Sequence, residues 1–217
     1  MARKAPPPRG PQLDLAGDLS VAFANTAGAR KKNRQLGVGS YADLLTWGQR
    51  AGVLSTATAE RLSRQAVDKP WQAKAAFAAA EKLRSALSRI FSSISAGAGP
   101  AAADLDTVND ALARAMPAVR LVQSEHGVIW GWAGGEDALD QVLWPVLLAA
   151  AGLLTSEEGR PRIRQCAAES CPLFFAERSP ARERIWCEMK SCGARDRSLR
   201  YYHRTGKFVE KKNWLYR

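Results

Sequence analysis

The sequence predicts a mainly α-helical protein with one β-hairpin in its N-terminal domain and a small, cysteine-rich ββα-like module at its C-terminus. Three observations support this fold class. Apolar residues recur at helical spacing through most of the chain before Gly159. Two short segments there alternate with the period of a strand instead, and all four cysteines lie beyond Gly159. The 217 residues, of which 46% are hydrophobic, are enough for one core and a small appendage.

Four helices are predicted before residue 100. The second begins after Ser40, whose hydroxyl can accept a hydrogen bond from the first turn. The third ends before Pro70, because proline disfavours a helical conformation in the residue before it. The fourth has the longest apolar stripe and ends at Gly97. The four segments are Leu13–Thr26, Tyr41–Leu54, Thr56–Val67 and Trp71–Ser95.

A fifth helix is followed by a change from helical to alternating spacing. We expect Asp104 or Asp106 to cap this helix, which runs through about Met116. Apolar residues then alternate in two runs, which predict the two strands of a β-hairpin. The strands cover 119–123 and 128–132, and Glu125-His126-Gly127 supplies the turn.

The last helix of the N-terminal domain is predicted from about Glu136 to Leu154. It is apolar on nearly all sides, so we expect it at the centre of the core, kinked by Pro145. Its apolar run, Val142–Leu154, covers 13 residues. A membrane-spanning helix needs about 20 such residues, so this segment is predicted to be a buried helix.

The predicted elements divide the chain into four parts. No secretory signal is visible near Met1, so we expect a cytoplasmic protein. The parts are a disordered basic tail (1–12), a helical domain (13–159), the cysteine-rich module (160–207) and a basic tail with aromatic residues (208–217).

Positive charge is concentrated at the C-terminal end. The whole chain has a net charge of +11, and the segment Arg160–Arg217 alone holds 15 basic and 6 acidic residues. The longer segment before it, Met1–Gly159, is nearly balanced, with 17 basic and 15 acidic residues. Such asymmetry indicates a polyanionic partner, nucleic acid before membrane, and a charge that only maintains solubility is the alternative.

The four cysteines form two equal pairs. Each pair encloses four residues, and 15 residues separate the pairs. Structural zinc takes four ligands in a tetrahedron, and four thiolates close its coordination shell. The sequence therefore predicts one structural zinc ion per chain, with unpaired or redox-active thiols as the alternative. The predicted ligands are Cys166, Cys171, Cys187 and Cys192.

The gap between the pairs is long enough for a second, short β-hairpin. We expect one strand over Leu173–Ala176, a turn at Arg178-Ser179-Pro180 and a return strand through Arg184 to Cys187. A helix is then predicted from Gly193 to Thr205, beginning at the last ligand. This order of elements is the basis of the predicted ββα-like module.

The residues around the cysteines resemble the CGNR zinc finger. The family pattern has two cysteines, a Phe-x-Asp-x-Ser stretch, an Arg-x-Trp-Cys stretch and a final Cys-Gly-Asn-Arg tetrapeptide. This sequence departs from the pattern at Glu177, which replaces the Asp, and at Ala194, which replaces the Asn. The matching positions are Phe175, Ser179, Arg184, Trp186, Cys187, Cys192, Gly193 and Arg195.

The segment Leu13–Gly159 is similar to the ABATE domain. The resemblance rests on the Asn-Thr of VAFANT, the Leu-x-x-Trp of LLTWGQRAGVL and the order of a hairpin followed by a helix. An ABATE domain usually precedes the CGNR finger in bacterial proteins regarded as stress-responsive transcription regulators. The resemblance therefore implies a role in transcription regulation.

The helix predicted after the last cysteine carries candidate DNA contacts. On a helical wheel, Leu199 and Tyr202 fall near the side of Cys192, where we expect them to pack inward. A short helix with three guanidinium groups on one face suits a nucleic-acid groove, because Arg grips phosphate or binds guanine bidentately. A solvated basic face is the alternative. The opposite side of the helix presents Arg197, Arg200, Tyr201 and Arg204.

Three further arginines are candidate DNA contacts. Arg182 and Arg184 lie on or near the predicted second hairpin and could reach phosphates. Arg195 lies nearer the zinc site, so bracing that site is an equal alternative. In the tail over 208–217, aromatic residues among cations either stack on bases or dock onto the body.

A small-molecule ligand is a further predicted partner of the helical domain. Asn25 and Thr26 form a polar pair inside an apolar segment and must find hydrogen-bond partners, so they bind a ligand or cap a helix. No Ser/His/Asp, Cys/His or paired-carboxylate arrangement stands out, so we do not expect an enzyme. Four tryptophans either line a ligand pocket or build the core: Trp47, Trp130, Trp132 and Trp144.

Two functions from different classes remain open. The first is a DNA-binding transcription regulator with a structural zinc finger and an N-terminal helical domain that senses a ligand or forms a homodimer. The second is a zinc-stabilised interaction protein that binds RNA or a partner protein. The two differ in salt dependence, because a specific DNA binder keeps its preferred site when salt removes non-specific binding.

Overall fold

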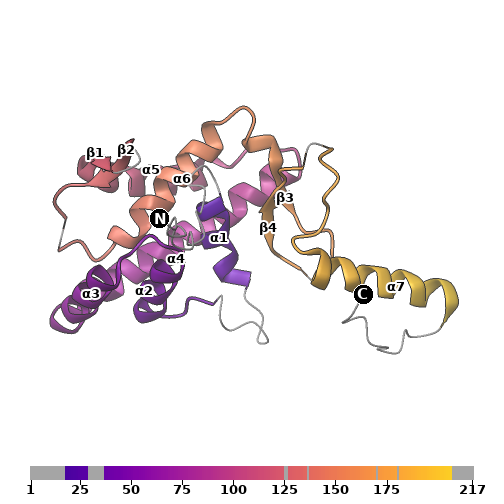
Figure 1. Cartoon of the computed structure of the whole chain (residues 1–217), viewed down its shortest axis with the longest axis horizontal. Helices are drawn as coiled ribbons and strands as arrows, with labels where there is room; N and C mark the ends of the chain where they lie inside the picture. Colours follow the sequence, from indigo (N-terminus) through magenta and orange to yellow (C-terminus); the bar gives the residue numbers. More distant parts are fainter. Residues whose placement is uncertain are drawn as a thin grey trace, which may run out of the picture.

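A computed structural model describes residues 18–28, 37–124, 127–135, 137–169, 171–179 and 181–206. The two predicted tails, the basic residues Arg30–Arg34 and the turn residues Glu125 and His126 lie outside the described residues. Figure 1 shows a helical body, from which the C-terminal helix projects to one side. The chain thus has two parts of very different size.

The order of elements matches the predicted fold class, which is confirmed. The helices are α1 (Asp18–Asn25), α2 (Tyr41–Arg50), α3 (Thr56–Asp68), α4 (Pro70–Ser95), α5 (Ala102–Ala115), α6 (Trp144–Thr155) and α7 (Ala194–Thr205). The strands are β1 (Val119–Ser124), β2 (Gly127–Trp132), β3 (Ile163–Gln165) and β4 (Phe174–Ala176). Short helical turns are η1 (Thr26–Gly28), η3 (Met116–Ala118), η4 (Gln141–Leu143), η5 (Arg160–Arg162) and η6 (Met189–Gly193).

Helix capping agrees with the sequence at one predicted site and differs at another. The Ser40 hydroxyl accepts a hydrogen bond from the Asp43 backbone N–H at 3.1 Å, as predicted. The prediction of Asp104 or Asp106 as the cap of α5 is wrong, because that helix begins one turn earlier, after Ala101. The Asp104 carboxylate is buried in the first turn and accepts hydrogen bonds from the Arg89 guanidinium at 2.6 and 2.9 Å.

Pro145 lies at the start of α6 and does not kink it. The predicted helix from Glu136 is wrong in its first part, where the chain forms the short turn η4 and α6 begins only at Trp144. Proline is well suited to the first turn of a helix, since its missing N–H would have no partner inside the helix there. Most of the apolar run Val142–Leu154 is buried as predicted, and Gly152 is its exposed position.

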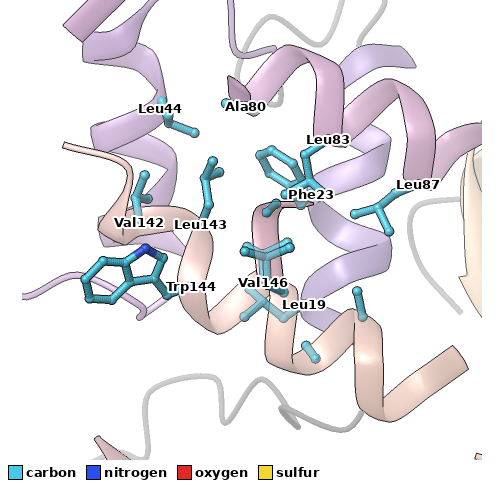
Figure 2. Packing of buried hydrophobic residues seen from close by; sticks show 14 of the residues in the cluster. Leu19, Phe23, Leu44, Ala80, Leu83, Leu87, Val142, Leu143, Trp144 and Val146 are labelled. Atoms are coloured by element: carbon cyan, nitrogen blue, oxygen red, sulfur yellow. The ribbon is translucent and has the colours of Figure 1, made fainter. Parts of the chain in front are cut away.

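The core of the body lies among α1, α2, α4 and α6. Figure 2 shows side chains of these helices converging on one cluster, with the η4 residues beside them. The long helix α4 runs through the middle of the body in Figure 1 and contacts both α1 and α5. Among the residues that the structure describes, no helix has the length and the apolar character needed to cross a bilayer. The labelled residues in Figure 2 are Leu19, Phe23, Leu44, Ala80, Leu83, Leu87, Val142, Leu143, Trp144 and Val146.

The first hairpin is confirmed, and most of its apolar side chains face solvent. Strands β1 and β2 pair antiparallel, with Val119 opposite Trp132 and Ser124 opposite Gly127. They form a two-stranded sheet in the described chain. The exposed apolar side chains of this hairpin are Leu121, Val122, Val128, Ile129 and Trp130.

The second hairpin has a different partner strand from the predicted one. Strand β4 pairs antiparallel with β3, which precedes the first cysteine, and not with the segment that leads to Cys187. The reason is burial, because Ile163 of β3 and Phe174 of β4 belong to the core of the helical body. The Phe174 ring lies edge-on to Phe91 of α4, with centroids 6.0 Å apart. The base of the cysteine-rich module is therefore anchored in the body.

Candidate metal centre and the basic helix

Two loops and one helical turn bring the four cysteines together. Cys166 follows β3 directly, and its backbone N–H donates to the Leu173 carbonyl at 2.9 Å. Cys171 closes a tight turn, in which its N–H donates to the Ala168 carbonyl at 2.8 Å. Cys187 lies in the loop after β4, and Cys192 lies in the π-helical turn η6, which leads into α7.

The positions of the sulfur atoms fit one zinc ion. All four Sγ atoms lie within 4.8 Å of one another, and Cys187 Sγ is 3.6 Å from both Cys171 Sγ and Cys192 Sγ. Four thiolates at about 2.3 Å from a tetrahedral zinc would be separated by roughly 3.8 Å. All four cysteines are free of disulfides. The cluster thus has the donor set and the spacing of a closed, structural site.

Burial and backbone N–H groups around the cluster shift the pKa values of the cysteine thiols in opposite directions. Burial raises the pKa of the Cys171 and Cys187 thiols, so zinc must displace protons from both when it binds. The Cys187 backbone N–H lies 3.4 Å from Cys166 Sγ and points toward it. Hydrogen bonds from the backbone of Cys187 and Ala168 outweigh burial and lower the pKa of the Cys166 thiol. Backbone dipoles thereby favour the thiolate form of the first ligand.

Arg184 holds the loop that carries Cys187. Its guanidinium lies 4.7 Å from the centroid of the Phe175 ring, and its Nε donates to the Trp186 carbonyl at 2.9 Å. A second guanidinium N–H donates to the Cys187 carbonyl. In the structure Arg184 therefore braces the metal site, while its predicted role in DNA binding stays a prediction.

Replacing Arg184 with Gln is expected to accelerate zinc loss about tenfold, because partners outside the first ligand shell typically change metal affinity by about 10- to 100-fold. The rate of zinc transfer to a chromogenic chelator measures this effect. Arg182→Gln is the matched control, since Arg182 is exposed in the same loop. Equal release rates in the two variants would contradict a bracing role for Arg184.

Steric crowding explains why a glycine, Gly193, follows the last cysteine ligand. A Cβ atom at Gly193 would lie 2.7 Å from the Met189 sulfur and 3.3 Å from the Trp186 ring. The ring of Trp186 packs against the cysteine cluster. A larger residue at Gly193 would therefore have to move the Met189 side chain and would press on the Trp186 indole beside the metal site.

Glu177 supports the module in a way that the sequence did not indicate. Its side chain is buried, and one carboxylate oxygen accepts a hydrogen bond from the Ser179 backbone N–H at 2.6 Å. This hydrogen bond lowers the pKa of Glu177, so the side chain is a carboxylate at neutral pH. The replacement of Asp by Glu thus still supplies an acceptor for the turn.

The basic helix α7 follows the turn that carries Cys192 and projects away from the helical body (Figure 1). None of its residues is buried, and Leu199 is 40% exposed. The prediction that Leu199 packs inward is therefore wrong, because no other helix of the described chain covers this side of α7. Tyr202 is half-buried, with its ring 5.9 Å from His203. Within the described chain, the side of α7 that carries Arg197, Arg200, Tyr201 and Arg204 is exposed.

The candidate DNA-contacting residues of α7 are exposed. Arg200 pairs with Asp196 at 2.8 Å on the same helix, and the Arg204 guanidinium lies 5.9 Å from the centroid of the Tyr201 ring. Arg195 and Arg197 are exposed and form no ion pair within the described chain. Arg182 is not part of α7 and lies between β4 and η6, with a φ of 52°. The structure thus brings four of the seven candidates to one side of α7: Arg197, Arg200, Tyr201 and Arg204.

Asn25 joins the helical body to the metal module. Its side-chain amide donates to the Phe174 carbonyl at 2.9 Å and accepts from the Phe174 backbone N–H at 2.8 Å. The Thr26 hydroxyl donates to the Phe23 carbonyl at 2.7 Å. Both polar groups of Asn25 thus have partners within the chain, and ligand binding by Asn25 and Thr26 stays a prediction. Ser95 adds a second link, because its hydroxyl accepts from the Gln165 N–H at 2.8 Å.

Replacing Asn25 with Ala is expected to lower the free energy of unfolding by about 2–3 kcal/mol, since two hydrogen bonds are lost and the partly buried N–H and carbonyl of Phe174 are left without partners. Urea unfolding followed by circular dichroism measures the loss. Asn109→Ala is the control, because Asn109 is exposed on α5. A loss below about 0.5 kcal/mol for Asn25→Ala, within the range of ordinary surface substitutions, would contradict this role.

Two protein-family models match the chain. One is ABATE, with the description "Putative stress-induced transcription regulator", and it matches residues 17–157, about two thirds of the chain. The other is the CGNR zinc finger, which matches residues 162–205 and includes all four cysteines. Neither description is that of an enzyme. A comparison with curated proteins gave no match. Both resemblances drawn from the sequence are confirmed, as is zinc as the cofactor of the cysteine cluster.

Proposed function

Because the chain belongs to the ABATE family and ends in a CGNR zinc finger, we propose that it is a transcription regulator that binds DNA through α7. The observation that carries this proposal is the exposure of most of the helix, including all four of its arginines. Its 12 residues include four arginines and one acidic residue, and none of them is buried. A helix that contributes nothing to a core, yet is held at a fixed place by a metal site, is available for a partner.

The dimensions and charges of α7 suit the major groove of DNA. A helix of this length is about 18 Å long, and the major groove is about 12 Å wide, enough to admit an α-helix. Arg197 and Arg204 project from one side, seven residues or about two helical turns apart. Guanidinium groups at this spacing can contact phosphates or the edges of successive bases. Arg182 and Arg195 lie outside this side and would contribute further phosphate contacts.

The helical domain is proposed as the part that senses a signal or forms a homodimer. It contains the core of the chain, and it touches the finger through Asn25, Ser95 and the strand pair β3–β4. A change in the body at α1 or α4 would therefore reach the base of the finger. A regulator of this kind would act in the cytoplasm, where bacterial DNA lies. We include a role in a stress response in the same proposal.

Selection of bound fragments from a random DNA pool tests the proposed function. We expect a preferred site that is retained at about 150–200 mM salt, where non-specific binding through phosphates is lost. The zinc-loaded full chain is the protein to use. Recovery of no preferred sequence, with equal binding to RNA or to any DNA, would contradict the proposal and favour the zinc-stabilised interaction protein.

A further inference from the structure

An apolar groove lies between the first hairpin and α6. Its volume is about 400 Å³, within the range of about 300–1,000 Å³ that is usual for small-molecule sites. Trp130 and Trp132 of β2 line one side, and Pro145, Leu148 and Gly152 of α6 line the other. The groove is separate from Asn25 and Thr26 and from the metal site.

Strand β2 carries both tryptophans of the groove, and the core residue Trp144 supports one of them. Trp130 and Trp132 are two residues apart on β2, so both side chains point to the same face of the hairpin. The ring of Trp132 packs on the buried ring of Trp144, with centroids 5.4 Å apart. Trp130 is 55% exposed although it lines the groove. One aromatic ring is thus fixed by the core, and the next is open to a ligand.

The α6 side of the groove has unfilled space. A Cβ atom at Gly152 would meet no atom within 4 Å. Glycine inside a helix costs about 1 kcal/mol relative to alanine. Gly152 therefore lowers the stability of α6 and leaves room above the helix, at the place where a ligand would lie.

The lining residues determine the kind of ligand. None of them is charged, although 24% of the residues of the chain are. The larger cavity lined by α4, α5 and residues 137–140 differs, because charged side chains of both signs, among them Lys82 and Asp110, line it. Burying a charge without a partner is unfavourable, and aromatic rings stack well on indoles. We propose that the groove beside Trp130 binds an uncharged, planar aromatic small molecule.

This inference rests on the proposed function only in that such a ligand would be the signal sensed by the helical domain.

N-phenyl-1-naphthylamine, an uncharged aromatic fluorophore, is a suitable probe of the groove. We expect saturable binding of one molecule per chain, seen as energy transfer from tryptophan to the probe. Gly152→Leu fills the groove and Trp130→Ala removes its exposed side, so each is expected to weaken binding at least tenfold.

Two matched variants serve as controls. Gly99→Leu adds the same side chain where a Cβ also meets nothing, and Trp71→Ala removes a tryptophan that is 79% exposed on α4. Both are expected to bind the probe as the unaltered chain does, and circular dichroism checks that all four variants are folded. The DNA selection uses no probe, so failure of DNA binding and failure of probe binding are separate results.

Three outcomes would overturn the inference. The first is probe binding that does not saturate, and the second is equal loss of binding in the control variants. The third is a dimer, seen by light scattering, that Gly152→Leu and Trp130→Ala both dissociate. In that case the groove holds a second copy of the chain and not a small molecule.

Discussion

Replacing Cys187 with Ala is expected to reduce the zinc content from one equivalent to less than about a tenth, and to unfold the finger beyond β4 while the helical body stays folded. The apolar cluster of the module consists largely of the ligands themselves, with Ala168 and Trp186 packed around them. Zinc binding supplies about 10–16 kcal/mol in small zinc-finger domains, so little remains to hold this module without the metal. Elemental analysis measures the zinc, and amide hydrogen exchange measures the unfolding.

The boundary of this unfolding is a specific part of the prediction. Ile163 and Phe174 belong to the core of the body, and Asn25 holds Phe174 by two hydrogen bonds. Amides of β3 and β4 are therefore expected to keep their protection, whereas those of α7 lose it. Glu183→Ala, an exposed change in the Cys187 loop, is the control and should retain zinc. Loss of protection in α1 to α6 as well would mean that the module is an integral part of a single core.

The sequence predicted well those features that depend on local patterns. The hairpin β1–β2 followed from alternation over 119–123 and 128–132, and the cap of α2 followed from Ser40. The cysteine cluster followed from spacing, because two equal pairs are sufficient to surround one ion. In each of these cases the residues that determine the structure lie close together in the sequence.

The wrong predictions concern contacts between distant segments. Strand β4 has three residues, too few to show a pattern, and its partner is fixed by burial of Phe174 and by Asn25, which is 149 positions away. The helical wheel gives the direction of Leu199 about the helix axis, on the side of Cys192. A wheel cannot show whether another part of the chain covers that side. Asp104 failed as a cap because α5 begins after Ala101, which places Asp104 inside the first turn, where its carboxylate binds Arg89 of α4.

Replacing Arg197, Arg200 and Arg204 together with Gln is expected to weaken binding to the selected DNA site at least a hundredfold at physiological salt. The change removes three charges from one side of α7, and Gln has nearly the helix propensity of Arg. The logarithm of the affinity falls linearly with the logarithm of the salt concentration. If each arginine contacts one phosphate, this slope becomes shallower by about 2.7. Zinc content is expected to stay at one equivalent, because all three side chains are exposed, Arg200 pairs with Asp196 and the Arg204 guanidinium lies over the Tyr201 ring. Fluorescence anisotropy with labelled DNA over a range of salt concentrations gives both quantities.

A control with the same loss of charge separates position from net charge. Arg64, Lys74 and Arg114 are exposed on helices of the body, and replacing all three with Gln changes the net charge equally. This variant should keep most of its affinity and most of its salt slope, because long-range attraction is screened beyond about 10 Å at 0.1 M salt. Equal losses in the two triple variants would mean that overall charge attracts the DNA and that α7 makes no direct contact. Binding that survives the α7 change altogether would move the contact surface to the basic residues beyond Lys207 or to Arg30–Arg34.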